Sequence, residues 1–98
     1  MKSMTQEIVS FVIEARFEDL PQSVIHEAKR LLLDSIGCGL GGMYTEKGDI
    51  SIKLANRLGG TPESTVIGTG DRVLSTSAAF ANGELINAMD YDAINGHT

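Results

Sequence analysis

The sequence is poor in cysteine, proline and aromatic residues, and it contains no cluster of basic residues. Its 98 residues include one cysteine, Cys38, two prolines and no tryptophan. A single cysteine forms no internal disulfide and completes no zinc motif, which excludes a disulfide-stapled domain and a zinc finger. Lysine and arginine number 8 against 13 aspartates and glutamates, giving a formal net charge of −5. This acidic balance argues against nucleic acid as a partner and against electrostatic docking on anionic membranes.

Long hydrophobic runs are also missing. Residues 1–7 are mostly polar and contain no apolar segment of the kind that a secretory signal peptide needs. The most apolar stretch, residues 31–43, is too short to span a bilayer and contains Asp34. Together with the single cysteine, these features predict a cytoplasmic protein that makes no membrane contact.

What the chain does have is helical periodicity. Hydrophobic residues make up 42% of the sequence, enough for the core of one domain. Apolar residues that would share one face of a first helix are Ile8, Val9, Val12 and Ile13. Ser3 and Gln6 have the spacing of a capping box that opens this helix. A second helix is expected to be capped by Asp19, to have Pro21 in its first turn, and to reach the glycine-rich residues 37–42, where it either stops or continues against a closely packed neighbour.

The second half of the chain predicts two more helices around a β-hairpin. Residues 49–58 fit a short helix that Gly59 ends. The β-branched residues within 64–68 and the run 72–74 predict two short strands. Serine and threonine at 75–77 offer N-caps for a fourth helix, so the predicted fold class is mainly α, a helical domain with a small β-hairpin. Leucines expected in its core are Leu32, Leu54 and Leu85.

The densest group of chemically active side chains lies within residues 90–97. Asp90, Asp92 and His97 place two carboxylates and an imidazole in a segment that reads as a loop, where catalytic groups concentrate. A histidine near carboxylates can act as an acid or a base near neutral pH. Two other interpretations stay open: an ordinary turn, which Asp, Asn and Gly favour, and a divalent cation held by these three side chains without a further visible ligand. An EF-hand loop is excluded, because Ile94 and Asn95 occupy positions that need a ligand and a glycine.

Other candidates have simpler explanations. Residues 37–42 match the pattern GxGxxG, but a phosphate-binding loop needs a strand before it and a helix after it, whereas a helix precedes here. Cys38 has no basic neighbour in sequence and is interpreted as a buried structural thiol, and His26 as a solvated residue on a helix face. Cations that are also interpreted as solvated are Lys29, Arg30, Arg57 and Arg72. No cofactor and no metal are expected.

Several strings, taken in order, carry a family resemblance. They are LDSIGCGLGG at residues 33–42, LGG at 58–60, ESTVIGTG at 63–70, AFANG at 79–83, MDYD at 89–92 and finally Gly96-His97. In this order and spacing the chain, from about Thr5 onward, resembles the start of the MmgE/PrpD family. That family includes 2-methylcitrate dehydratase, cis-aconitate decarboxylase and iminodisuccinate epimerase.

The resemblance implies a mostly helical first domain, a smaller α/β second domain and usually a homodimer, in chains several times longer than this one. Residues 1–98 would then be an incomplete N-terminal part of the helical domain, inactive alone and lacking the second domain. The implied chemistry moves a proton at a carbon next to a carboxylate of a small polycarboxylate substrate. A lyase-like loss of water or carbon dioxide is favoured, and the alternatives are an epimerase or isomerase of the same family and a non-catalytic helical interaction module.

The resemblance also implies the site residues. Asp90 is carried over first, for positioning the substrate or a catalytic base, and His97 second, for acid/base catalysis or carboxylate binding. Asp92 is carried over third. Two departures stand out: many members have a histidine in place of Asn87, and many have Asp-Asp-Thr in place of residues 92–94. The hydroxyl missing from that string favours a divergent subgroup with a different substrate.

Overall fold

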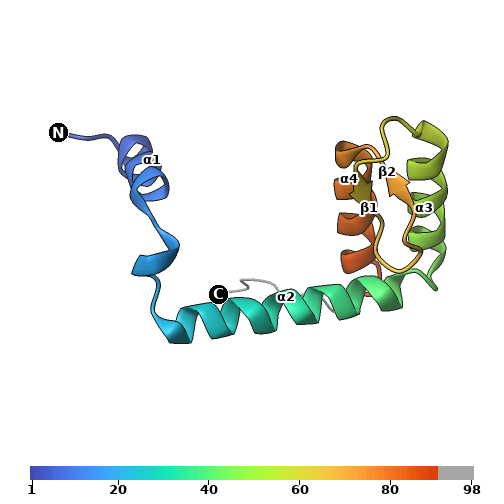
Figure 1. Ribbon diagram of the computed structural model, residues 1–98, viewed down its shortest axis with the longest axis horizontal. Helices are drawn as coiled ribbons and strands as arrows, with labels where there is room; N and C mark the ends of the chain where they lie inside the picture. Colours follow the sequence, from blue (N-terminus) through green and yellow to red (C-terminus); the bar gives the residue numbers. More distant parts are fainter. Residues whose placement is uncertain (91–98) are drawn as a thin grey trace.

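The computed structural model describes residues 1–90, which contain four α-helices and one two-stranded antiparallel sheet (Figure 1). In chain order the elements are α1 (Met4–Glu14), α2 (Gln22–Gly42), α3 (Glu46–Leu58), β1 (Ser64–Thr65), β2 (Arg72–Val73) and α4 (Ser75–Asn87), with a short 3₁₀ turn at Phe17–Asp19 before α2. The strands pair Ser64 with Val73 and Thr65 with Arg72. The prediction of a mainly helical chain with a small hairpin is confirmed. Within residues 1–90, no helix has both the length and the apolar character needed to cross a membrane.

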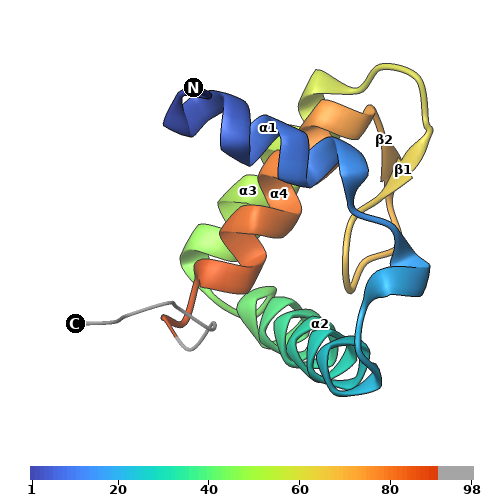
Figure 2. The ribbon, with the colours of Figure 1, turned by 90° about the vertical axis from the view of Figure 1, so that its left-hand side faces the viewer.

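Helix α2 is the base of an open, U-shaped molecule (Figure 1). Helix α1 rises from one end of α2, and α3, α4 and the sheet form a packed unit at the other end. A second view shows that both rise on the same side of α2 (Figure 2). The radius of gyration is 16.8 Å, compared with about 13 Å for a compact domain of about 100 residues. The chain on its own is therefore expanded.

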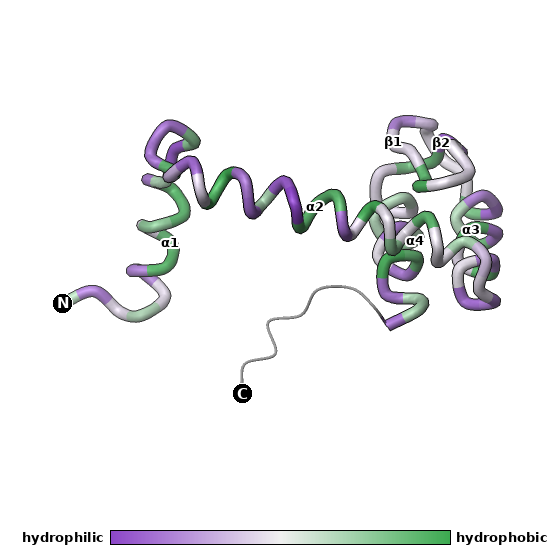
Figure 3. Tube along the Cα trace, turned by 90° about the horizontal axis from the view of Figure 1, so that it is seen from below, coloured by the Kyte–Doolittle hydropathy of each residue, from purple (hydrophilic) through white to green (hydrophobic). Residues whose placement is uncertain are grey.

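Helix α1 is well formed but buries nothing. Its predicted capping box is confirmed, with the Ser3 hydroxyl accepting from the Gln6 amide and the Gln6 side chain accepting from the Ser3 amide. No residue of α1 is buried, and its exposed apolar residues are Met4, Ile8, Val9, Phe11, Val12 and Ile13. Apolar residues are visible along both α1 and α2 (Figure 3). A helix this short is marginal in water by itself, so α1 depends on a surface that residues 1–90 do not supply.

Helix α2 continues through the glycine-rich stretch and does not stop there. Pro21 is its N-cap and Asp19 ends the preceding 3₁₀ turn, so the predicted Asp19 cap is wrong. A Cβ atom on Gly42 would collide with the backbone carbonyl of Leu85, and one on Gly48 would collide with the carbonyl of Gly42. These glycines let α2, α3 and α4 meet backbone to backbone, which is the second of the two outcomes expected for the run.

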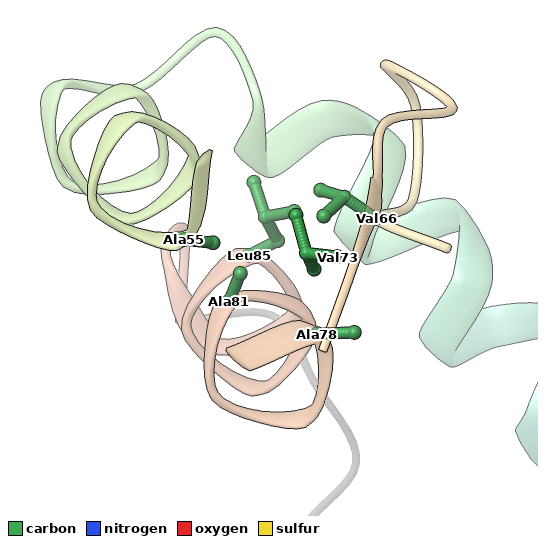
Figure 4. Packing of buried hydrophobic residues seen from close by; sticks show 6 residues of the cluster. All are labelled: Ala55, Val66, Val73, Ala78, Ala81 and Leu85. Atoms are coloured by element: carbon green, nitrogen blue, oxygen red, sulfur yellow. The ribbon is translucent and has the colours of Figure 1, made fainter. Parts of the chain in front are cut away.

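The buried apolar side chains come from α3, α4 and the hairpin, and the end of α2 packs against them through Gly42 and Met43 (Figure 4). Its buried apolar residues are Ala55, Val66, Val73, Ala78, Ala81 and Leu85. Leu85 is therefore core, as predicted. The predictions for the other two leucines are wrong, because Leu32 is 62% exposed and Leu54 is 41% exposed. Leu32 lies ahead of the glycines at which α2 meets α4, and Leu54 lines an open groove between α3 and α4.

The starts of α3 and α4 differ from the sequence prediction. Helix α3 begins at Glu46, three residues early, because the Thr45 hydroxyl caps it by accepting from the Gly48 amide at 3.0 Å. Helix α4 has no side-chain cap from residues 75–77, which lie inside the helix. Its first amide, that of Ser75, donates instead to the Glu63 carboxylate at 3.0 Å. Glu63, which precedes the hairpin, thus caps α4 in place of the Ser and Thr hydroxyls at 75–77.

Candidate functional site

Helix α4 precedes the candidate site segment, and its last turns pack against the core. Leu85 is fully buried, and the backbone of α4 at Leu85 lies directly against Gly42 of α2. Helix α4 packs on both α2 and α3. The end of α4, at Asn87, is therefore held from two sides, and the chain leaves it at a defined point.

Asn82 belongs to this scaffold. Its side-chain oxygen accepts from the Ile67 amide at 2.8 Å, and its side-chain nitrogen donates to the Thr65 carbonyl at 3.0 Å. Asn82 therefore ties the segment that begins with β1 to the middle of α4. Asn82, which belongs to the AFANG string, therefore has a structural role in this chain. The first residue of the candidate site is Asp90.

Asp90 adopts a backbone conformation that is uncommon for a residue with a side chain. Its φ is 60°, and within residues 1–90 it is the single non-glycine residue with a positive φ. Its amide donates to the Asn87 carbonyl at 2.9 Å, so the chain turns sharply off the end of α4. The side chain is exposed. Aspartate tolerates this region better than most residues, and such conformations concentrate at functional sites.

The other two predicted site residues, Asp92 and His97, lie outside the described residues 1–90, as do Ala93 and Ile94. The arrangement of the Asp90, Asp92 and His97 side chains therefore stays a prediction, and so does the cation that they were considered to hold. Within residues 1–90, no group of three or more His, Cys, Asp and Glu side chains could hold a metal ion.

A cation that the sequence analysis did not single out lies at the end of α4. The Lys47 ammonium is 3.1 Å from Glu84 Oε2 and donates to Asn87 Oδ1 at 3.1 Å. The Lys47 side chain is 44% exposed and that of Glu84 is 34% exposed. Lys47 and Asn87 are 40 residues apart in the chain. No local pattern could have paired them, because the contact requires α3 and α4 to pack first.

The cations that were interpreted as solvated are exposed, as predicted. Arg30 pairs with Glu27 at 3.0 Å along one helix face, and Arg72 donates to the Thr65 hydroxyl at 2.7 Å across the hairpin. A further exposed pair joins Lys53 to Asp49 at 2.8 Å, and the hydrogen bond to Asp49 raises the pKa of Lys53. None of these three contacts involves Asp90.

Two of the three remaining candidates behave as their simpler explanations predicted, and Cys38 does not. Residues 37–42 are inside α2, so the GxGxxG pattern is not a phosphate-binding loop. His26 is exposed, as predicted, whereas Cys38 is half-buried and is not the buried thiol that was expected. An open groove of about 430 Å³ lies beside Lys47, lined by Glu46, Ile50, Ser51, Phe80 and Glu84. Its openness makes it a surface for packing more than an enclosed site for chemistry.

Comparisons with known proteins agree with the resemblance. Residues 6–95 match the family described as MmgE/PrpD N-terminal domain. The chain is 34% identical over 93 residues to human cis-aconitate decarboxylase, 33% identical over 90 residues to the cis-aconitate decarboxylase-like protein oryM of Aspergillus oryzae, and 32% identical over 93 residues to mouse cis-aconitate decarboxylase. These alignments cover 92–94% of this chain but 19% of each relative. No solved structure matches.

Proposed function

Because this chain belongs to the MmgE/PrpD family, we propose that residues 1–98 supply the N-terminal part of the helical domain of an enzyme that acts on a small polycarboxylate. The chain spans about a fifth of the length of its curated relatives. A second, α/β domain and the rest of the helical domain would come from further sequence. In this proposal residues 1–98 hold part of the active site and are inactive alone.

The proposed reaction is lyase-like. In a decarboxylation, the bond from the carboxyl carbon to its neighbour breaks, carbon dioxide leaves, and a proton is added to the carbon framework in its place. In a dehydration, a proton leaves a carbon next to a carboxylate and the adjacent hydroxyl departs as water. Both need a positioned acid or base beside an anionic substrate. Asp90 would position the substrate or a catalytic base, His97 would exchange the proton or bind a carboxylate, and Asp92 would support them.

The observation that carries this proposal is the position of Asp90. It lies three residues after Asn87, the end of a helix that the core holds, and its φ of 60° belongs to a class of conformations enriched at functional sites. The test is turnover by the whole protein, with cis-aconitate first and then other small di- and tricarboxylates. Asp90→Asn and His97→Ala should each lower kcat at least tenfold while the melting temperature stays near that of the wild type. A wild-type rate in both variants on the accepted substrate would remove this segment from the mechanism.

Two alternatives lead to different products. An epimerase would return a product of unchanged mass and inverted configuration, whereas a lyase would release water or carbon dioxide. The resemblance leaves room for the epimerase, because residues 92–94 lack the hydroxyl that many members have. A non-catalytic interaction module would turn over none of these substrates. The exposed apolar faces of α1 and α2 are the observation that supports this second candidate, because they could bind another protein.

We also propose the partners. Later segments of the same polypeptide would cover the apolar faces of α1 and α2, and the complete protein would be a cytoplasmic homodimer. The expanded radius of gyration and the unburied α1 support the need for a cover. Light scattering on the whole protein measures the dimer directly, and a monomer mass at micromolar concentration would contradict it.

A further inference from the structure

The Lys47 ammonium joins two helices at the point where the candidate site begins. It reaches from the first turn of α3 to the last turn of α4, where it meets both Glu84 Oε2 and Asn87 Oδ1 at 3.1 Å. Glu84 and Asn87 are three residues apart and share one face of α4. One amine therefore holds two positions of the same helical turn.

The backbone of Lys47 is held firmly on its own side. The next residue, Gly48, is wedged against the Gly42 carbonyl and the Leu85 side chain, with no room for a Cβ atom. The amide of Gly48 donates to the Thr45 hydroxyl at 3.0 Å. The buried Ser51 donates its hydroxyl proton to the Lys47 carbonyl at 2.8 Å. The flexible part of the contact is thus limited to the Lys47 side chain.

Asn87, one of the two acceptors for Lys47, is also hydrogen-bonded to Asp90. Asn87 is the last residue of α4, and its carbonyl accepts from the Asp90 amide at 2.9 Å. The Lys47 ammonium also lies at the carboxyl end of α4, where the helix dipole favours a positive charge. Asn87 therefore accepts a hydrogen bond from Lys47 with its side chain and one from Asp90 with its backbone carbonyl.

We propose that Lys47 is a positioning residue for Asp90. By holding Glu84 and Asn87, its amine keeps the last turn of α4 closed and fixes the point and direction at which Asp90 leaves the helix. The consequence for catalysis rests on the proposed function, in which Asp90 belongs to the active site. The structural part, the control of the Asp90 backbone by Lys47, does not depend on it.

The experiment combines hydrogen exchange with kinetics in the whole protein. Lys47→Met removes the charge and the donors while keeping most of the aliphatic stem, and Lys47→Arg keeps a cationic donor. Lys53→Met is the matched control, because Lys53 lies on the same helix and its ion pair with Asp49 does not involve α4. For each variant, residue-resolved exchange of the Asp90 amide is measured together with kcat and KM for the accepted substrate.

Lys47→Met should speed exchange of the Asp90 amide at least fivefold and lower kcat several-fold with KM within twofold of the wild type. Lys47→Arg should restore most of both, and Lys53→Met should change neither. Wild-type exchange at Asp90 in Lys47→Met overturns the inference. A raised KM with unchanged exchange also overturns it, since Lys47 would then bind substrate directly.

Two further results keep the structural and functional claims separate. If the whole protein turns over none of the polycarboxylates, the proposed function fails, and the exchange data alone decide whether Lys47 controls Asp90. If Lys47→Met lowers the melting temperature strongly, Glu84→Gln with Lys47 intact loosens the same turn more mildly. In that variant, unchanged Asp90 exchange overturns the inference.

Discussion

The exposure of three leucines gives a stability experiment with internal controls. Leu85 is fully buried, Leu54 is 41% exposed and Leu32 is 62% exposed. Each can be changed to alanine, so the chemistry of the substitution and the helical setting are the same at all three positions. The differences in the free energy of unfolding then report only on how each side chain is packed.

The structure sets the expected sizes. Removing a fully buried leucine side chain costs about 2–5 kcal/mol, because a cavity adds to the lost burial. Complete burial of a leucine contributes about 1.5–3 kcal/mol, so Leu32, with most of its surface already in water, should cost below about 1 kcal/mol. Leu54 should lie between them. A gap of about 2 kcal/mol between Leu85 and Leu32 changes the unfolding equilibrium roughly 30-fold.

Urea unfolding of the 98-residue chain, followed by far-ultraviolet circular dichroism, measures these differences. Because a marginal domain holds only about 5–15 kcal/mol, Leu85→Ala could remove the folded state altogether. Leu85→Met, which keeps the volume, should then retain a transition with a loss below about 1.5 kcal/mol. Equal losses at Leu85 and Leu32 would refute the assignment of the core to the unit of α3, α4 and the sheet.

The same substitutions in the whole protein test the proposed cover of α2. If later segments pack on that face, Leu32→Ala should cost about 2–5 kcal/mol there, while the cost at Leu85 should stay the same. A cost below about 1 kcal/mol at Leu32 in both settings would mean that this face stays in water, which contradicts the cover.

Two further predictions concern backbone contact and pH. Gly42→Ala should lower the free energy of unfolding by at least about 1–3 kcal/mol, because the added Cβ meets the Leu85 carbonyl. Gly37→Ala, which has open space around it, should raise it by up to about 1 kcal/mol through helix propensity. Urea unfolding in which both variants shift in the same direction would contradict the packing. The Ser75 amide lowers the pKa of Glu63 below its ordinary value of 4.5, so the stability from this contact is present above pH 4.5 and is lost as pH falls through the lower folded pKa. Glu63→Gln should flatten the decline of melting temperature in that acidic range, and an unchanged decline would show that the contact adds no pH dependence.

Local signals predicted the elements well. The capping box at Ser3 and Gln6 and the hairpin follow from spacing and residue type. Each of these features is decided by residues close together in the chain. The sequence could therefore predict the type and order of the elements.

Features that depend on distant contacts were missed. Glu63 caps α4 from the other side of the hairpin, and Lys47 meets residues some forty positions away. The exposure of Leu32 could not be predicted either, because helical periodicity identifies an apolar face and not the element that covers it. Asp90 was identified by its place among acidic and histidine side chains and by the resemblance, and its backbone geometry came only from the structure.

The length of α2 also affects how this protein is made. With 21 residues, α2 separates its two ends by about 30 Å, so the packing of one end gives no support to the other. On a ribosome, α1 emerges before α2, α3 and α4, yet none of its residues is buried within residues 1–90. The unit of α3, α4 and the sheet contains its own core and can close soon after residue 90 leaves the exit tunnel. Helix α1 would then pack later than helices made after it, and until it packs, its apolar side chains are exposed to chaperones and to aggregation.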